Sequence, residues 1–248
     1  GPAGQVTSLT GWPLMKRLTA KADGGVLGFV GSQLMSMSPQ GKATLVAGSA
    51  VAGHADGPAL QAQFQGGRSL EEPDGILVAD GSNVVVRRVA NGQVTTVLGQ
   101  VGVGGFNDGH KSVARLGFPQ GVARMPDGSL LILDGRIRRL AGDVLTTIAA
   151  TPAAPYPATA PPADGVAATA QVSGAVHLKA LPSGAYAFLD ANTVRKLVPP
   201  AKVCSDGNPC TLDTCLPATG ACAFVPIGDG GGCSDGDGCT QGEACAGG

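Results

Sequence analysis

The chain has 248 residues, of which 43% are hydrophobic and 14% are charged, so it carries enough apolar surface to fold and is not expected to be disordered. Its 40 glycines and 18 prolines, with only 4% aromatic residues, favour many short strands joined by tight turns. The net charge of −1, without a long basic run, argues against nucleic acid or an anionic membrane as a partner. We therefore expect an all-β protein.

The N-terminal sequence GPAGQVTSLTG has neither the charged region nor the apolar region of a secretion signal, so we expect any such signal to be absent or already removed. No apolar stretch approaches the ~18 residues that a membrane-spanning helix needs. We therefore expect a soluble chain with no membrane span in this segment. A fragment of a longer protein would fit the same observations.

Four similar segments follow one another along the chain. Each contains a tight turn, and these turns, at Asp23-Gly24, Asp74-Gly75, Asp127-Gly128 and Ser183-Gly184, are 51, 53 and 56 residues apart. An apolar run follows each turn (GVLGFV, ILVAD, LLILD and AYAFLD), and a run of this kind is typical of a strand buried on both faces. A second strand comes next (LMSMS, VVVRRV, RIRRL and TVRKL). In three segments a β-branched third strand ends the repeat (KATLVAG, QVTTVLG and DVLTTIAA).

A further shared element precedes three of the repeats. The sequences HADGPALQAQF, FNDGHKSVARL and PADGVAATAQV place an Asp-Gly pair six residues ahead of an Ala-Gln/Arg-apolar triplet. We interpret this element as an Asp-capped turn of helix that inserts one apolar side chain, namely Phe64, Leu116 or Val172, between neighbouring units.

A period near fifty residues with several strands per unit is typical of β-propeller blades. Over residues 4–198, DGPALQAQF, PDGILVADGSN, VRRV and GQVTTVLG resemble the NHL-repeat family, and the resemblance implies a propeller that usually closes with about six blades. Four blades are present, so we expect either a small closed ring or part of a larger one, with ILVAD, LLILD and AYAFLD nearest the axis. The sequence GQVTSLTG at residues 4–11 matches an outer strand, and either completes the last blade or, as we favour, ends a blade further upstream.

Charged pairs recur in three of the blades. Asp80, Asp134 and Asp190 end the apolar runs, and Arg87, Arg138 and Arg195 follow on the next strand. Repetition in three blades suits architecture better than catalysis, so we predict structural Asp/Arg pairs across the strands and no catalytic residue. The first blade has Gly31 and Ser36 at these positions, and we expect it to be softer.

The last part of the chain has a different composition. All seven cysteines lie there, at Cys204, Cys210, Cys215, Cys222, Cys233, Cys239 and Cys245. We therefore predict a propeller at residues 1–198, a linker at 199–203 and a small disulfide-rich module at 204–248. The gaps of 5, 4, 6, 10, 5 and 5 residues and the lack of histidine disfavour a zinc site and favour disulfides. Because CSDGNPCT and CSDGDGCT begin two copies, a second copy cut before its last cysteine accounts for the odd number.

The stretch CSDGNPCTLDTCLPATGAC resembles cysteine-rich repeats of slime-mould and bacterial surface proteins, which implies an oxidising, extracellular or cell-surface location. Asp206, Asp213, Asp235 and Asp237 are candidate calcium ligands, although most Asp-Gly pairs merely form turns. We expect no cofactor, with calcium as the weaker alternative.

Motifs for common enzyme chemistry are absent from the sequence. The leading hypothesis is a secreted or cell-surface binding or structural protein, with a protein or glycan ligand on the loop face of the propeller. The alternative is an extracellular propeller lyase or hydrolase with a metal in the central channel. His54, His110 and His177 come from different blades and could converge on the central channel, as zinc ligands do in lyase-type relatives of the NHL family, but exposed loop histidines are far commoner.

Overall fold

The computed structural model describes residues 13–149, 163–166, 170–172, 174–190 and 192–199, together with two strands further on, at 211–215 and 222–226. The chain divides into two compact units, one formed by Gly1–Arg124 and Ser129–Leu197 and the other by Met125–Gly128 and Val198–Gly248. Apart from one 3-10 turn, η1 (Gly81–Asn83), all described elements are strands. Within these residues no helix is long and apolar enough to cross a membrane.

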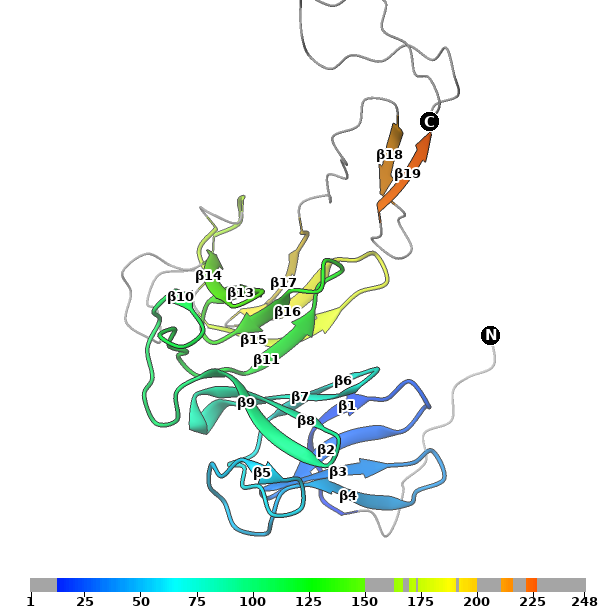
Figure 1. Ribbon diagram of the computed structural model, residues 1–248, viewed down its shortest axis with the longest axis vertical. Coiled ribbons are helices and arrows are strands. Elements are labelled where there is room, and N and C mark those ends of the chain that lie inside the picture. The colour runs from blue at the N-terminus through cyan, green and yellow to red at the C-terminus, as the bar shows by residue number, and fades with distance from the viewer. Residues whose placement is uncertain are drawn as a thin grey trace, which may run out of the picture. The chain divides into compact units, whose positions relative to one another are not determined.

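The first unit contains four antiparallel sheets, and the four-blade arrangement predicted from the repeats is confirmed (Figure 1). The first blade consists, in order, of β1 (Lys16–Ala20), β2 (Val26–Val30), β3 (Gln33–Met37) and β4 (Ala43–Ala47). In the second blade the order is β5 (Gly57–Pro58), β9 (Gln93–Gly99), β8 (Val85–Ala90), β7 (Gly75–Asp80) and β6 (Arg68–Glu72).

The third blade repeats the plan of the second, and the fourth contains three described strands. The third has the order β10 (Gly109–His110), β14 (Val144–Ala149), β13 (Ile137–Ala141), β12 (Leu130–Leu133) and β11 (Gly121–Arg124). The fourth has the order β15 (Ala175–Ala180), β16 (Tyr186–Asp190) and β17 (Thr193–Leu197). An isolated bridge between Ala163 and Gln171 lies outside these strands.

The strands nearest the axis are not the predicted ones. Strands β1, β6, β11 and β15 pack on one another in succession from blade to blade, so they line the axis (Figure 1). The runs ILVAD, LLILD and AYAFLD form β7, β12 and β16, which are second in their sheets. The prediction was wrong because neighbouring blades, stacked face to face, bury a second strand on both sides, whereas a strand at the axis keeps an open edge that tolerates polar residues.

The core of the propeller lies between the blades. Phe29 of the first blade meets Phe64 edge to face, with ring centroids 5.6 Å apart, in a cluster that also holds Leu34 and Val78. Leu116 and Ile132 belong to a second cluster between the next two blades. Burying one such side chain stabilises the fold by about 1.5 to 3 kcal/mol.

The predicted helical turn before each of three blades is confirmed. The amides of Ala62, Ala114 and Ala170 each donate to the carbonyl four residues earlier, and the apolar residues two positions later, among them Phe64 and Leu116, are buried. The aspartates ahead of these turns do not cap them in the predicted way, because their carboxylates bind elsewhere in the blade.

The second unit contains one described hairpin, formed by β18 (Thr211–Cys215) and β19 (Cys222–Pro226). Its register pairs the backbone of Cys215 with that of Cys222. The cysteines at 204, 210, 233, 239 and 245, the aspartates at 206, 235 and 237, the N-terminal strand predicted at 4–11 and most of the predicted linker lie outside the described residues.

Candidate functional site

The third blade encloses an arginine between two carboxylates. Arg138 is fully buried, and its guanidinium lies 3.0 Å from Asp134 Oδ2 and 2.6 Å from Asp108 Oδ1. It also donates to the carbonyls of Asn107 and Arg115. The planar fork of arginine thereby ties β13 to the segment that enters the blade, and each donor that is used replaces a hydrogen bond to water.

The same arrangement recurs in the second and fourth blades. Arg87 lies 3.6 Å from Asp80 and 2.6 Å from Asp56 and donates to the carbonyls of Ala55 and Gln63. In the fourth blade the corresponding pairs are Arg195 with Asp190, at 2.7 Å, and with Asp164, at 3.0 Å. The structure thus brings together each predicted Asp and Arg, and adds a second carboxylate.

The second carboxylate is that of Asp56, Asp108 or Asp164, each of which is the aspartate predicted to cap a helical turn. Each lies 30 or 31 residues before its arginine. Asp56 also accepts from the Thr96 amide and Asp108 from the Thr147 amide, so both hold the outer strand of their blade. The nearly constant offset from Asp to Arg was the signal in the sequence, but a capping role for an Asp-Gly pair explained the same recurrence.

The buried carboxyls of these networks have perturbed pKa values. Burial raises the pKa of Asp134 and of Asp80, against the opposing effects of Arg138 on the first and of Asn83 and Arg87 on the second. Both side chains are shielded from solvent, and their partners are backbone, arginine and, for Asp80, asparagine groups of their own blade. The perturbation therefore belongs to the framework of the blade and does not indicate a catalytic site.

The first blade has apolar residues in place of the network. Met37 faces Val26 as Val89 faces Ile76, so Met35 takes the position of Arg87 and Val30 that of Asp80. The prediction that Gly31 and Ser36 occupy these positions was one residue out, because Ser36 faces Leu27 as Arg88 faces Leu77. This blade therefore depends on its apolar contacts with the second blade, through residues such as Phe29 and Leu34.

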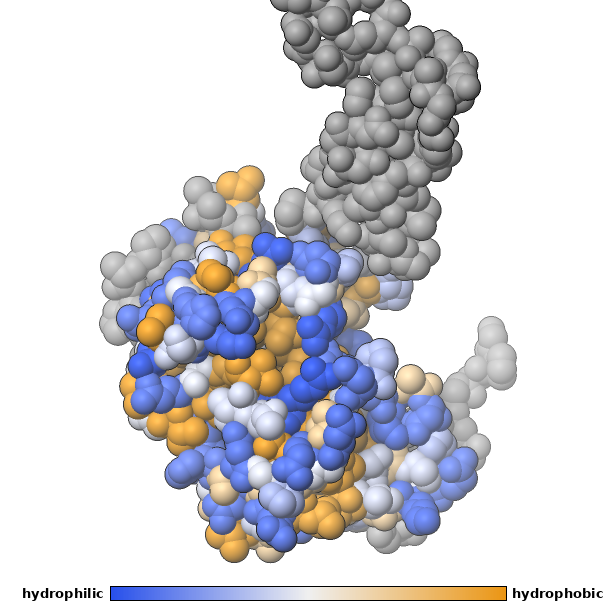
Figure 2. Space-filling model, in the orientation of Figure 1, coloured by the Kyte–Doolittle hydropathy of each residue, from blue (hydrophilic) through white to orange (hydrophobic). Residues whose placement is uncertain are grey.

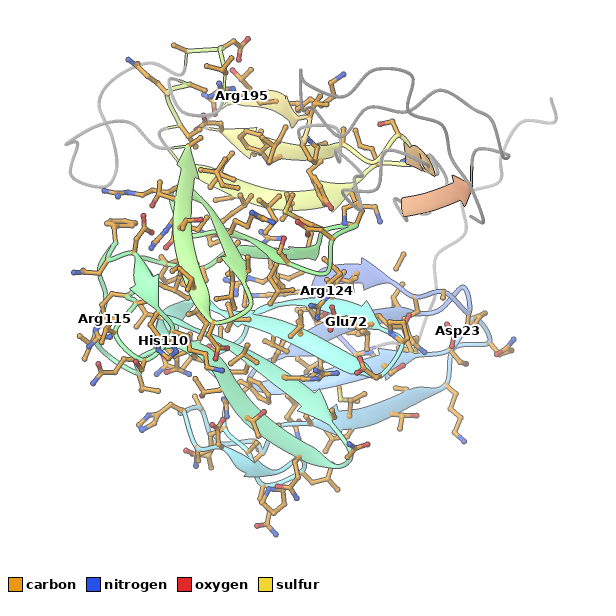
Figure 3. The ribbon with its side chains drawn as sticks, turned by 45° about the horizontal axis from the view of Figure 1, so that its top comes forward. Asp23, Glu72, His110, Arg115, Arg124 and Arg195 are labelled. Atoms are coloured by element: carbon orange, nitrogen blue, oxygen red, sulfur yellow. The ribbon has the colours of Figure 1, made fainter. Side chains whose placement is uncertain are left out.

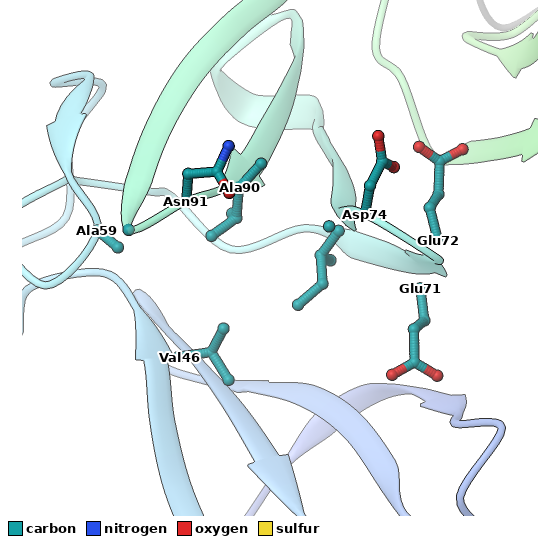
Figure 4. Close-up of a pocket in the computed structure, with 11 residues that line it drawn as sticks. Val46, Ala59, Glu71, Glu72, Asp74, Ala90 and Asn91 are labelled. Atoms are coloured by element: carbon teal, nitrogen blue, oxygen red, sulfur yellow. The ribbon is translucent and has the colours of Figure 1, made fainter.

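A groove of about 360 Å³ opens between the first two blades (Figure 4). Its apolar lining is Val46, Ala59, Ile76, Val89 and Ala90, and its polar lining includes Glu71, Glu72, Asp74 and Asn91. On the exposed face in Figure 2, polar residues cover most of the surface and apolar ones gather in the hollow where the blades meet.

Each carboxylate of the groove already has a cationic partner. Glu72 binds the Nε and Nη2 of Arg124 at 2.7 and 2.8 Å (Figure 3). Glu71 accepts from the Ala22 amide at 2.9 Å and lies 3.9 Å from the Lys21 ammonium, and Asp74 pairs with Arg88. These carboxylates are thus held in place as fixed acceptors, which suits recognition of a polar ligand better than proton abstraction.

The three histidines do not form one metal site. His110 lies on the outermost strand of the third blade, where its ring contacts Ser112 and Asp143, whereas His177 lies on the axial strand β15. The four strand spacings across the third blade alone separate these positions by roughly 19 Å. His54 is exposed, and no group of three metal-ligating side chains occurs in the described part of the chain. The hypothesis that the three histidines bind one zinc ion was therefore wrong, because His110 and His177 lie too far apart to share it.

The calcium candidates are mostly beyond the described strands. Asp213 lies in β18, where its backbone pairs with that of Phe224, and Asp206, Asp235 and Asp237 are outside the described residues.

Comparison with known proteins gives one match to a sequence family, the Dictyostelium (slime mold) repeat, over residues 203–227. No curated protein matches the chain. Among solved structures, a protein of unknown function from Bacteroides thetaiotaomicron is 16% identical, with a TM-score of 0.59, covering 72% of this chain and 46% of its own.

Two further solved structures are described as auxiliary nutrient binding proteins. The one from Bacteroides thetaiotaomicron is 14% identical and that from Bacteroides ovatus 16% identical; both have a TM-score of 0.52 and cover 71% of this chain and 45% of their own. The chain thus spans slightly less than half the length of these structures. At such low identity the similarity shows the propeller fold alone.

Proposed function

We propose that this chain is part of a secreted or cell-surface protein whose NHL-type propeller binds a protein or glycan ligand, with a disulfide-rich repeat following the propeller. The propeller fold supports a binding scaffold, and two solved structures with this fold are described as nutrient binding proteins. The match to the Dictyostelium repeat at 203–227 supports the cysteine-rich module and, through it, an oxidising location.

One observation carries the binding proposal, namely the groove between the first two blades. An apolar floor with a few fixed polar groups at the rim is the usual composition of a ligand site. The ion pairs of Glu72 with Arg124 and of Asp74 with Arg88 hold the rim in one geometry before a ligand arrives. A preformed rim lowers the entropy lost on binding.

The test is a ligand screen with a blocked groove. Soluble oligosaccharides and peptides are screened against the whole chain by thermal shift, and hits are measured by calorimetry. Ala90→Trp fills the groove with an indole, whereas Ala141→Trp places the same side chain at the equivalent strand end of the third blade, outside the groove. We expect Ala90→Trp to abolish binding and Ala141→Trp to retain it. Equal binding by both variants would place the ligand elsewhere and overturn this assignment.

The metal content of the purified chain tests the same proposal against an enzyme. Because each carboxylate of the groove has a cationic partner and the three histidines are dispersed, we expect no stoichiometric zinc. Zinc bound at one equivalent in the propeller would overturn the scaffold proposal in favour of a channel metal.

A further inference from the structure

Three basic side chains from three different blades meet beside the axis of the propeller. Arg17 lies on β1, Arg68 begins β6 and His177 lies on β15. The Nη2 of Arg68 lies 2.9 Å from Nε2 of His177, and Nη1 of Arg17 lies 3.9 Å from the place that a Cβ on Gly66, two residues before Arg68, would occupy. We call these three residues the axial basic cluster.

No acidic side chain neutralises this cluster among the described residues. By contrast, the arginines of the three Asp/Arg networks, Arg87, Arg138 and Arg195, each bind two carboxylates. Burial and then the nearby Arg17 lower the pKa of Arg68, and burial followed by both arginines lowers the pKa of His177. The cluster is therefore held together against its own repulsion, which makes it a receptor for negative charge.

Backbone irregularities direct two of these side chains. Arg17 and His177 have φ angles of 58° and 57°, and each lies where the register of its strand shifts. Only two other described non-glycine residues have positive φ, Val84 after the 3-10 turn and Asn91 in a hairpin turn. A bulge re-aims a side chain, and left-handed backbone at a bulky residue costs about 1 to 3 kcal/mol. Two blades have such a bulge, and both bulges direct a basic side chain to the axial basic cluster. This recurrence favours a function for the cluster.

The third blade has a glycine, and so no side chain, at the position along its axial strand that corresponds to Arg68. Gly121 of β11 faces Leu133 of β12 as Arg68 of β6 faces Ala79 of β7, so the positions of Gly121 and Arg68 correspond. A Cβ on Gly121 would lie 3.0 Å from the Cβ of Leu178, so the glycine also lets β15 approach closely. This approach helps to bring His177 to Arg68.

The cluster is separate from the groove. Arg68 begins β6, whereas Glu71 and Glu72, which line the groove, end it. The four steps along the strand separate the two sites by roughly 13 Å. The axial strands thus carry a basic site at one end and a groove with neutralised carboxylates at the other.

We propose that the axial basic cluster binds an oxyanion, a carboxylate, sulfate or phosphate group of a ligand, between Arg17, Arg68 and His177. Each guanidinium presents parallel N–H donors that match two oxygens of such a group. Arginine can only donate, so Nε2 of His177 accepts from Arg68 in the free state and the ring is neutral. When the anion takes the Arg68 donors, His177 binds a proton from solution and donates to the anion as well.

Binding is accordingly coupled to pH. The charged groups on the strands around His177 are Lys16 and Arg17 on β1, Arg68, Glu71 and Glu72 on β6, Arg124 on β11, Lys179 on β15 itself, and Asp190 on β16. The three carboxylates already have cationic partners, namely Lys21 for Glu71, Arg124 for Glu72 and Arg195 for Asp190. An added anion would therefore favour the imidazolium at this place. We therefore expect anion affinity to rise as the pH falls through the pKa of His177, which lies below 6.5 in the free protein.

The test measures binding of three simple anions by the whole chain. Inorganic sulfate, inorganic phosphate and sodium glucuronate are titrated calorimetrically at constant ionic strength set with chloride. We expect saturable binding that Arg68→Gln and Arg17→Gln each weaken about tenfold or more, since each removes a charge-assisted contact. Lys42→Gln, which removes one exposed positive charge from the first blade, is the matched control and keeps the affinity. Sulfate, whose charge is constant, also reports the pH dependence, which His177→Gln abolishes.

Stability separates this role from a purely structural one. Because Arg68 relieves no buried carboxylate, Arg68→Gln in chloride should melt at or above the wild-type temperature, and Arg17→Gln, at an exposed site, provides a second variant if the first is poorly folded. Tighter binding of glucuronate would indicate a ligand with a carboxylate group. Tighter binding of sulfate or phosphate would indicate a ligand with a sulfate or phosphate ester. Binding no tighter than that of chloride, or undiminished in both arginine variants, overturns the proposal.

Discussion

At the scale of single residues, three blades of the propeller are each stabilised by a buried arginine that binds two carboxylates. Arg138 gives up hydration entirely, and it does so with carboxylates on two sides and backbone carbonyls beyond them. An arginine buried in this way contributes little when compared with a well-packed apolar residue, but removing one member leaves the others charged and unpaired. The networks of Arg87 and Arg195 have the same dependence.

Replacing Arg138 with methionine should therefore destabilise the propeller strongly. The variant leaves Asp134 buried and Asp108 without its partner, so we expect the free energy of unfolding to fall by about 3 to 5 kcal/mol. Urea unfolding followed by fluorescence or circular dichroism measures the change. Lys42→Met, at an exposed position, should change it by less than about 0.5 kcal/mol. A similar small loss for both variants would show that the buried network has no special role.

Asp108 gives the stability a pH dependence of defined sign. Desolvation raises the pKa of this carboxyl, but hydrogen bonds from the Thr147 amide and the Arg138 guanidinium outweigh it, so the folded-state pKa lies below 3.8. A lowered carboxyl pKa contributes stability above the unfolded-state value, near 4, and this contribution is lost as the pH falls through the folded-state value. Asp108→Asn should therefore lower stability at pH 7 and flatten its decline below about pH 4, as urea unfolding across pH would show. A decline as steep as that of wild type would contradict this origin.

At the scale of elements, three blades contain an Asp/Arg network and the first blade lacks one. The first blade places Val30 and Met35 where the second has Asp80 and Arg87, and its axial strand β1 is largely exposed. The blade is held by apolar packing against Phe64 of the second blade and by strand hydrogen bonds. Because the first blade has fewer long-range ion pairs, its local unfolding should need less free energy.

We therefore expect β3 and β4 of the first blade to exchange their amide hydrogens faster than β8 and β9 of the second. Hydrogen exchange measured by mass spectrometry resolves these strands, because they lie in different stretches of the chain. A variant of the second blade, Arg87→Ser, should move β8 and β9 toward the behaviour of the first blade. Equal protection in all four blades of the wild type would count against a fastening role for the charges.

Much of the blade plan could be predicted from the sequence, because each blade repeats the same strand and turn pattern. The order of strands from the axis could not, since apolar runs such as LLILD show burial on both faces but not which neighbours bury them. Strand β6, with Arg68 and Glu72, has no repeated apolar signature, and its place at the axis depends on contacts between blades.

The sites show the same limit. Asp134 and Arg138 recur with their counterparts and could be paired from sequence, whereas Asp108 was assigned to a helix cap because its Asp-Gly turn satisfies the cap pattern equally well. Arg17 and His177 occupy no repeated position. They come together only through bulges and through the close approach of successive axial strands, which no local pattern encodes.

At the scale of the whole molecule, the two units depend on different sources of stability. The propeller contains no cysteine and is held by interblade clusters and buried ion pairs. Residues 204–248 contain all seven cysteines, many glycines and few apolar residues. A short segment of that composition cannot bury enough surface to fold by itself, and disulfides, each worth about 2 to 4 kcal/mol, are the usual compensation.

Reduction should therefore unfold the C-terminal module and leave the propeller intact. Seven cysteines form at most three bridges, so mass spectrometry of an oxidised, alkylated sample should find three intramolecular disulfides and one reactive thiol. Among Cys204, Cys210, Cys215 and Cys222, two bridges can be made in three ways, and peptide mapping would identify the one present. After reduction, proteolysis should remove the module while the β-sheet circular dichroism of the propeller persists. Seven free thiols, or zinc bound by the cysteines, would contradict both the disulfides and the oxidising location that they imply.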